Sequence, residues 1–158
     1  MVYIFMAVMA VLILALDQIT KLLTVAKIPL YQSIEVIPGL FGLTYVQNDG
    51  AAFSMLEGQH WLFAIVFAVF AAFILWEFPK KRLPLSTFER FCIVAVFAGG
   101  LGNMIDRLRL GYVIDMIETK FMNFPIFNVA DIFVTCGCIA LMVHIIFFNK
   151  EFWKDEKK

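Results

Sequence analysis

The stretch GGLGNMIDRLRLGYVIDMIE, from Gly99 to Glu118, combines closely spaced glycines with polar and charged side chains in a strongly apolar chain. Its polar members include Asn103, Asp106, Arg107 and Asp115. An ionisable group in apolar surroundings is costly, and inside a membrane it marks a functional site by default. We therefore interpret these residues as part of one site at a membrane surface, completed by residues distant in the sequence.

The composition excludes an ordinary soluble domain. Of the 158 residues, 62% are hydrophobic and only 16% are charged, and the mean hydropathy is +0.86. Soluble domains are close to half apolar, so the chain is predicted to be an integral membrane protein. The formal net charge of zero gives no indication of a nucleic-acid partner.

Four apolar stretches are each close to the roughly 20 residues that a helix needs to cross a membrane. They cover about residues 2–26, 61–78, 88–108 and 127–148. We expect an all-α membrane protein with four transmembrane helices, forming one domain over residues 1–158. The first stretch is followed by the polar run DQITK rather than by a small-residue cleavage site, so it is interpreted as a retained helix and not as a cleaved signal peptide.

The positions of Lys and Arg predict the orientation, because short cytoplasmic loops are enriched in both. The loop between the second and third stretches and the tail after the fourth carry most of them: Lys80, Lys81, Arg82, Arg90, Lys150, Lys154, Lys157 and Lys158. Both termini and the second loop are therefore expected in the cytoplasm. The first and third loops are expected on the extracytoplasmic side.

The segment from about residue 27 to residue 60 has a different residue pattern from the predicted helices. It alternates β-branched, aromatic and polar residues, and Asn48-Asp49-Gly50 is a strong turn signal. We expect a small extracytoplasmic β-sheet here. By contrast, the AGGLG run at 98–102 is interpreted as a packing feature, because small residues let membrane helices approach closely.

Helix rise and direction place the polar residues at one depth. A helix rises about 1.5 Å per residue, so the position of a residue in its helix gives its depth in the membrane. Six polar or charged residues near three different predicted helices fall in the outer leaflet: Asp17, Asn103, Asp106, Arg107, Asn128 and Asp131. Asp115 follows Gly111, which can turn the chain back to the same zone. The predicted site is therefore near the extracytoplasmic face.

Asp115 and Asp131 have only apolar neighbours and no adjacent cation. Such carboxyl groups should have raised pKa values, and two of them close together would share a proton. A structural alternative exists for Asp131, because Asn128 and Asp131 have the spacing of a helix N-cap. A structural alternative also exists for Asp17 and Lys21, because residues four apart on a helix can form an ion pair that has no role in catalysis.

Paired carboxyl groups indicate acid–base hydrolysis without a covalent intermediate. A Ser54–Lys21 pair is the weaker nucleophilic alternative. Cys136 and Cys138 lie two positions apart on a helix and so make a poor metal pair. We expect neither a metal nor another cofactor.

Five motifs in order resemble the bacterial lipoprotein signal peptidases, also called signal peptidase II. They are DQITK (17–21), NDGAAFS (48–54), GNMIDR (102–107), VID (113–115) and FNVAD (127–131). Each motif alone is weak, but together on four spans they are highly specific. Two departures are Val-Ile-Asp-Met, where the family commonly has Val-Val-Asp-Phe, and Asp49, which adds a negative charge.

The resemblance implies a four-helix membrane aspartyl endopeptidase with a sheet that cradles the substrate. It implies that Asp115 and Asp131 are catalytic, and that Asn48, Gly50, Asn103, Arg107 and Asn128 orient substrate and dyad. Asp17, Lys21 and Asp106 would hold the site together. The implied substrate is a diacylglyceryl-modified prolipoprotein in membrane lipid, cut before the lipidated Cys, and we expect the enzyme to be monomeric.

Two other classes of protein compete with this interpretation. A proton-coupled transporter also needs intramembrane carboxyl groups, but it would spread them through the membrane as a relay. Here the inner halves of the four predicted helices are nearly free of acidic residues, and Glu77 and Glu89 lie at the predicted cytoplasmic edge. A scaffold would explain the glycines but not the isolated Asp115.

Overall fold

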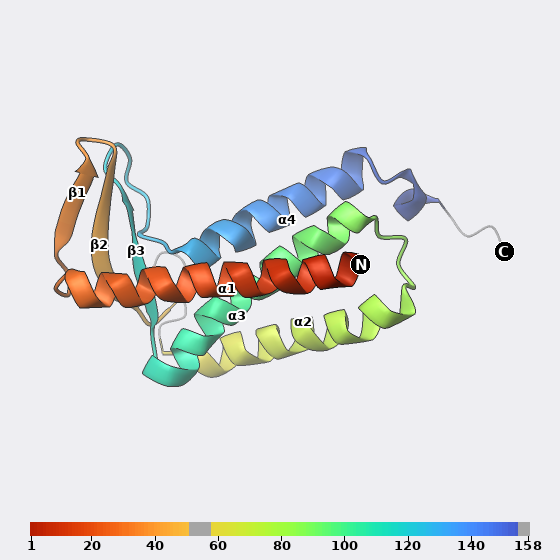
Figure 1. Cartoon of the computed structure of the whole chain (residues 1–158), viewed down its shortest axis with the longest axis horizontal. Coiled ribbons are helices and arrows are strands. Elements are labelled where there is room, and N and C mark those ends of the chain that lie inside the picture. The colour runs from red at the N-terminus through yellow and green to blue at the C-terminus, as the bar shows by residue number, and fades with distance from the viewer. Residues whose placement is uncertain (51–57, 155–158) are drawn as a thin grey trace.

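Four long helices and a small sheet make up the computed structural model, which describes residues 1–50 and 58–154 (Figure 1). The helices are α1 (Val2–Lys27), α2 (His60–Lys80), α3 (Thr87–Leu110) and α4 (Val129–Phe147). All four are long and apolar enough to cross a membrane. The strands β1 (Ser33–Ile37), β2 (Phe41–Asn48) and β3 (Val113–Thr119) form one antiparallel sheet, and a short 3-10 helix, η2 (Lys150–Trp153), follows α4. The predicted fold class is confirmed.

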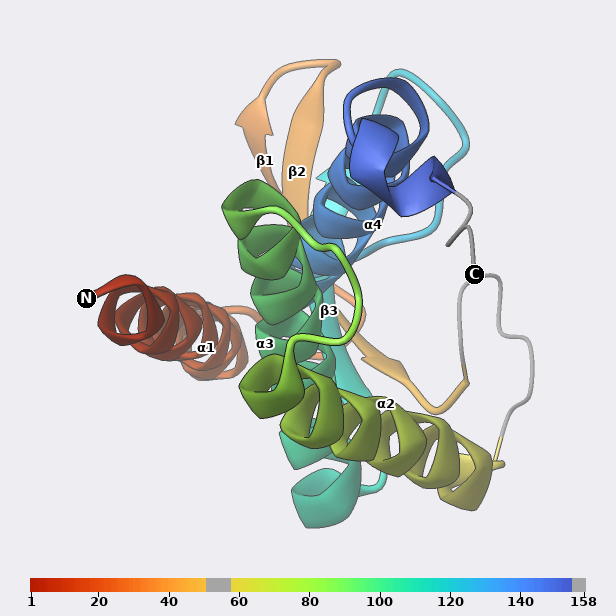
Figure 2. The same ribbon diagram turned by 90° about the vertical axis from the view of Figure 1, so that its right-hand side faces the viewer.

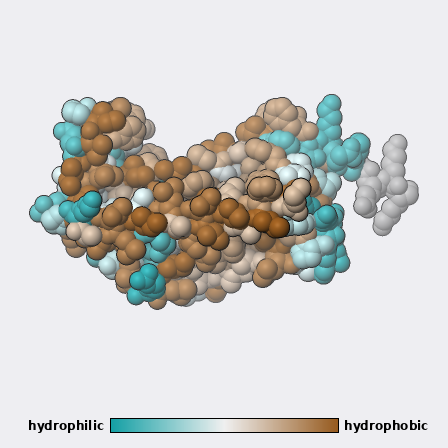
Figure 3. All heavy atoms as spheres, in the orientation of Figure 1, coloured by the Kyte–Doolittle hydropathy of each residue, from teal (hydrophilic) through white to brown (hydrophobic). Residues whose placement is uncertain are grey.

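The outer surface of the helices is apolar, as a lipid-facing surface must be. Large side chains such as Leu12, Val69, Leu75 and Phe147 are more than 60% exposed. Figure 3 shows hydrophobic residues along the middle of the molecule and hydrophilic residues gathered at its two ends. The protein is therefore a multi-pass membrane protein.

Helix α3 lies at the centre of the bundle and packs against the other three helices (Figure 2). Its glycines permit this packing. A Cβ on Gly99 would lie 2.6 Å from the carbonyl oxygen of Ala130 in α4, and one on Gly102 would lie 2.5 Å from Oδ2 of Asp17 in α1. The interpretation of AGGLG as a packing run is confirmed.

The sheet lies at one end of the bundle, and β2 is its central strand (Figure 1). The sequence predicted strands only within residues 27–60, but β3 comes from the chain between α3 and α4. Gly111, with a φ of 80°, ends α3 and turns the chain back, and β3 then pairs so that Asp115 lies opposite Val46. The hydrophobic β-branched residues Val113, Ile114 and Ile117 suit this half-buried strand.

A buried polar cluster fixes the end of the bundle that lies opposite the sheet. Ser86 and Glu89 form a capping box at the start of α3. The Glu89 carboxyl group, which is fully buried, also lies 2.8 Å from Nδ1 of His144 and accepts from the Asn149 side chain at 2.8 Å. These contacts tie the end of α4 to the beginning of α3, far from the sheet.

Candidate active site

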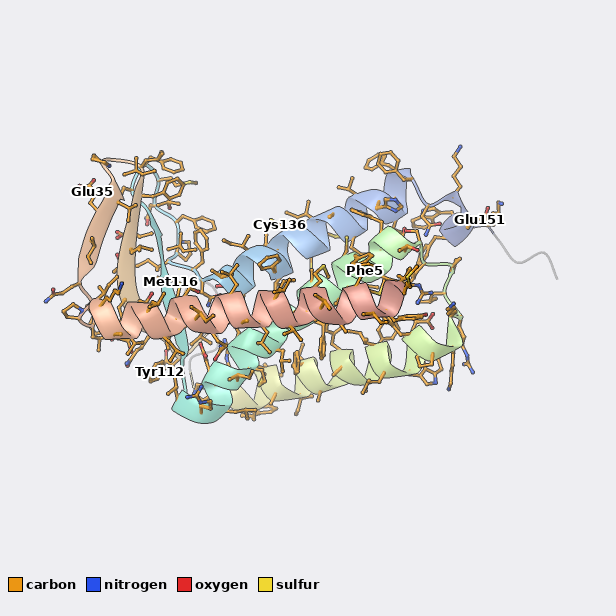
Figure 4. The ribbon with its side chains drawn as sticks, in the orientation of Figure 1. Phe5, Glu35, Tyr112, Met116, Cys136 and Glu151 are labelled. Atoms are coloured by element: carbon orange, nitrogen blue, oxygen red, sulfur yellow. The ribbon has the colours of Figure 1, made fainter. Side chains whose placement is uncertain are left out.

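Strand β3 carries Asp115 into the junction between sheet and helices. Figure 4 shows its near neighbours on the chain, Tyr112 and Met116, at this junction. The Asp115 side chain accepts from Nδ2 of Asn48 at 2.9 Å and from Nδ2 of Asn128 at 2.6 Å. Only 2% of Asp115 is exposed, and this burial, reinforced by the nearby Asp131 carboxyl group, raises the pKa of Asp115 to about 7 although the two amides oppose the shift.

The first turn of α4 holds Asp131. Its Oδ1 accepts from Nδ2 of Asn103 at 2.8 Å, and its Oδ2 accepts from the backbone N–H of Asn128 at 3.0 Å. In return, Oδ1 of Asn128 accepts from the backbone N–H of Asp131 at 3.0 Å. The capping interpretation is therefore correct, and it is compatible with a catalytic role because the cap fixes the carboxyl group in place.

Two side-chain amides, those of the buried Asn128 and the half-buried Asn103, connect the carboxyl groups. Nδ2 of Asn128 lies within hydrogen-bonding distance of both Asp115 and Oδ1 of Asn103 (3.0 Å to the latter). Asn103 in turn donates to Asp131. Asp115 and Asp131 thus belong to one continuous network although they come from a strand and a helix.

Behind this network, Lys21 binds three oxygen acceptors. Its Nζ lies 2.9 Å from Asp17, 2.8 Å from Asp106 and 2.8 Å from Oδ1 of Asn103. Lys21, Asp17 and Asp106 are at most 3% exposed. The predicted Asp17–Lys21 pair is confirmed, but it is one part of a larger buried cluster that joins α1 to α3.

The same cluster also holds backbone from the two elements that carry the carboxyl groups. Asp17 accepts from the N–H of Ala130 at 3.0 Å, and Asp106 accepts from the N–H of Ile114 at 3.2 Å. Ala130 precedes Asp131 and Ile114 precedes Asp115. The ion cluster therefore sets where both carboxyl groups lie.

Arg107 connects the site to the loop after β2. Its guanidinium group donates to the carbonyl oxygens of Gly50 at 2.8 Å and Asn103 at 3.3 Å, and it lies 4.3 Å from the centre of the Phe63 ring. The rest of the predicted NDGAAFS motif, residues 51–54, lies outside the described residues. Ser54 of the alternative Ser–Lys pair is among them.

A cavity of about 400 Å³, here called the catalytic cavity, brings the predicted residues together. Six of them line it: Asn48, Gly50, Asn103, Arg107, Asp115 and Asp131. The other four are buried behind them: Lys21 and Asn128 contact lining residues directly, and Asp17 and Asp106 contact Lys21. Mostly apolar side chains complete the wall: Val113 of β3, the segment 124–127, and Ile132, Thr135 and Cys136 of α4.

Sequence reasoning missed two features of the site. Gln18 donates to Asp17 at 3.2 Å and to Asp106 at 3.1 Å, so it belongs to the ion cluster; its position inside DQITK was the available signal. The segment Phe124–Ile126 forms one wall of the cavity, and no polar motif marks it. Within residues 1–50 and 58–154, no group of three or more His, Cys, Asp and Glu side chains could hold a metal ion.

The fold and the site define a four-helix membrane protein with paired carboxyl groups in a cavity, an arrangement suited to acid–base hydrolysis. The family model for signal peptidase (SPase) II matches residues 9–147. The chain belongs to the signal peptidase II family, whose members are aspartic peptidases. The predicted family is therefore confirmed.

Individual relatives agree with this assignment. A lipoprotein signal peptidase of Streptococcus agalactiae serotype Ia is 43% identical over 149 residues, which cover 94% of this chain and 92% of the relative. One of Streptococcus pyogenes serotype M2 is 40% identical over 146 residues, 92% of this chain and 91% of the relative.

Two solved structures described as bacterial membrane enzymes share the fold. One has a TM-score of 0.84 at 33% identity and covers 98% of this chain and 93% of that chain. The second has a TM-score of 0.81 at 33% identity, with 91% of this chain and 94% of that chain covered.

Proposed function

We propose that Asp115 and Asp131 are the catalytic pair of this bacterial membrane enzyme, and that it cuts the amide bond before a diacylglyceryl-modified Cys. The reaction that they serve, the removal of signal peptides from prolipoproteins, is the activity of a lipoprotein signal peptidase. The single observation that carries the assignment of residues is that both carboxyl groups line one cavity and both accept a hydrogen bond from Asn128, Asp115 from its side-chain Nδ2 and Asp131 from its backbone N–H. A lipid-anchored substrate presents its scissile bond at the membrane surface, next to this cavity.

The two carboxyl groups take different roles in the proposed mechanism. Asp115, with its raised pKa, is the acid that donates a proton to the oxygen of the scissile carbonyl group. Asp131 lies in the first turn of a helix, where a negative charge is favourable, and it accepts from the Asn103 side-chain amide and from the backbone N–H of Asn128. It is therefore the base that takes a proton from the attacking water.

The products form when the two Asp residues transfer protons a second time. Attack of the water oxygen on the carbonyl carbon gives a tetrahedral diol. Asp131 then donates its proton to the leaving nitrogen, and Asp115 recovers its proton from one hydroxyl group as the C–N bond breaks. The signal peptide leaves with a carboxyl group and the lipidated Cys gains a free amino group, so both Asp residues return to their starting states without a covalent intermediate.

The remaining residues of the site support this pair. Asn48, Asn103 and Asn128 orient the carboxyl groups by direct hydrogen bonds, while Arg107 holds the Gly50 carbonyl group at the rim. The ion cluster of Asp17, Lys21 and Asp106 fixes the backbone beneath them. Because one chain supplies all these residues, the proposed active form is a monomer.

We assign the sheet and the site to the extracytoplasmic side. The loop with Lys80, Lys81 and Arg82 joins α2 to α3 at the end of the bundle opposite the sheet (Figure 1). Short loops rich in Lys and Arg remain in the cytoplasm. The start of α1 lies at this same end, where Tyr3 contacts Phe78, so a cytoplasmic N-terminus accompanies an outward-facing site.

Cleavage of a synthetic substrate tests the function. Purified protein in lipid is incubated with a diacylglyceryl-modified prolipoprotein and, as a control, with the unmodified precursor. The wild type should cut only the lipidated form. Asp115→Asn and Asp131→Asn should each lose at least about 10²-fold in kcat while still binding the substrate, and Glu35→Gln, on the exposed strand β1, should match the wild type. Full activity of either Asn variant would dismiss the catalytic pair, and an inactive wild type would dismiss the function.

A further inference from the structure

We propose that a second hollow beside the catalytic cavity binds the polypeptide on the downstream side of the scissile bond, and that Asp49 makes this subsite prefer cationic over anionic residues. This hollow, here called the polar cleft, has a volume of about 350 Å³. It is lined by Val46, Gln47, Asn48, Asp49, Asp115, Asn123, Phe124, Pro125 and Ile126. The inference rests on the proposed function and adds a substrate preference to it.

The polar cleft and the catalytic cavity meet at the reacting group. Both are lined by Asn48, by Asp115 and by the segment Phe124–Ile126. A peptide bound with its scissile carbonyl group at Asp115 therefore has one hollow on each side. An extended chain rises about 3.3 Å per residue, so only the few residues nearest the cut reach the two hollows.

The two hollows differ in where they lead and in what lines them. Beyond the shared residues, the catalytic cavity continues along α4, past Ile132, Thr135 and Cys136. The polar cleft continues instead toward the end of β2, past Gln47, Asp49 and Asn123. An apolar signal peptide fits the hollow along the membrane-spanning helix, which leaves the polar cleft for the chain that follows the lipidated Cys.

Asp49 is the other ionisable residue, besides Asp115, among those that line the polar cleft. The amides beside it have other partners, because Gln47 donates to the Tyr45 hydroxyl group at 2.9 Å and Asn48 donates to Asp115. Asp49 is exposed, and none of the ion pairs among residues 1–50 and 58–154 involves it. Its carboxylate is thus placed to attract a cation on the substrate and to repel an anion.

A charge series in the substrate tests the proposal. Lipidated prolipoproteins that differ only in the second residue after the Cys (Lys, Gln or Glu) are cleaved in neutral lipid, so that membrane charge does not contribute. The wild type should rank them Lys above Gln above Glu, with about two- to fivefold in kcat/KM between neighbours, the size expected for an exposed ion pair. About 0.5 M NaCl should shrink the differences.

Two substitutions in the cleft and one outside it complete the test. Asp49→Asn should equalise the three substrates, Asn123→Asp should steepen the ranking, and Glu35→Gln should leave it unchanged. The same ranking in Asp49→Asn, or an effect of Asp49→Asn on charges placed before the Cys instead, would overturn the proposal. A wild type that cuts no lipidated substrate would instead overturn the proposed function, so the two failures are distinguishable.

Discussion

Asn128 donates its side-chain amide to Asp115 across 2.6 Å, and the same side chain caps the helix that carries Asp131. One fully buried residue therefore serves helix formation and the geometry of the site together. The two roles can be separated by substitution, since Asp is also a good N-cap but cannot donate from an ionised side chain.

We predict that Asn128→Asp keeps the fold and loses activity. The cap remains, but Asp115 loses a donor and gains a neighbouring carboxyl group, so the pKa of Asp115 should rise further. We expect kcat to fall about 10- to 100-fold, the size of one lost buried hydrogen bond, with KM little changed. Asn128→Ala should additionally lower the unfolding temperature. Equal unfolding temperatures for the two variants would contradict the capping role.

The pH dependence of cleavage should report Asp115. Its pKa of about 7 means that it is protonated below that pH and ionised above it. If it is the acid, kcat should fall about tenfold per pH unit above pH 8. Glu118 cannot cause this decline, because hydrogen bonds from Lys120 and Thr44 lower the pKa of Glu118 to about 2. A kcat that keeps rising to pH 9 would rule out Asp115 as the acid.

Lys21→Met should destabilise the protein strongly. It leaves the buried carboxyl groups of Asp17 and Asp106 without their cation, and breaking a buried ion pair in this way costs about 3–5 kcal/mol. Thermal unfolding in detergent measures the loss, and cleavage should fall as well because Asn103, which donates to Asp131, loses one of the two donors to its Oδ1. Lys27→Met, at the exposed end of α1, is the matched control and should resemble the wild type.

Two glycines of α3 should respond differently to a methyl group. A Cβ on Gly102 would meet Asp17, which cannot withdraw because Lys21 and the Ala130 N–H hold it. Gly102→Ala should therefore lower the stability by about 1–3 kcal/mol and reduce cleavage. A Cβ on Gly100 would meet only the Phe67 ring at 3.3 Å, so Gly100→Ala should be mild. Similar losses for both variants would contradict the special role of Gly102.

The four membrane-spanning helices could be predicted from the sequence because a helix in lipid needs predominantly apolar side chains along its whole length. Their bounds differ from the structure by a few residues at most; α4 begins at Val129 rather than near 127 because Asn128 is its cap. The meeting of Asp115 and Asp131 could be inferred from depth, since helix rise gives the depth of Asp131 and the turn at Gly111 can return Asp115 to the same depth.

Other features depend on contacts between distant segments and could not be predicted in this way. Strand β3 looked like a loop because VIDMIET is short and its partner β2 lies far away in sequence. Gln18 gave no signal apart from its motif, since its three acceptors come from α1 and α3. The wall at Phe124–Ile126 is apolar, and an apolar segment in this chain has no distinguishing composition.

Strand β3 is both the edge of the small sheet and the backbone that carries Asp115. A molecule that binds the sheet and shifts its register or tilt would therefore misalign Asp115, the proposed acid, without contacting it. With the sheet on the extracytoplasmic side, as proposed above, a compound too large or too polar to enter the bilayer could inhibit this enzyme from that face. For the same reason, substitutions that adapt the sheet to a new substrate will tend to alter turnover along with affinity.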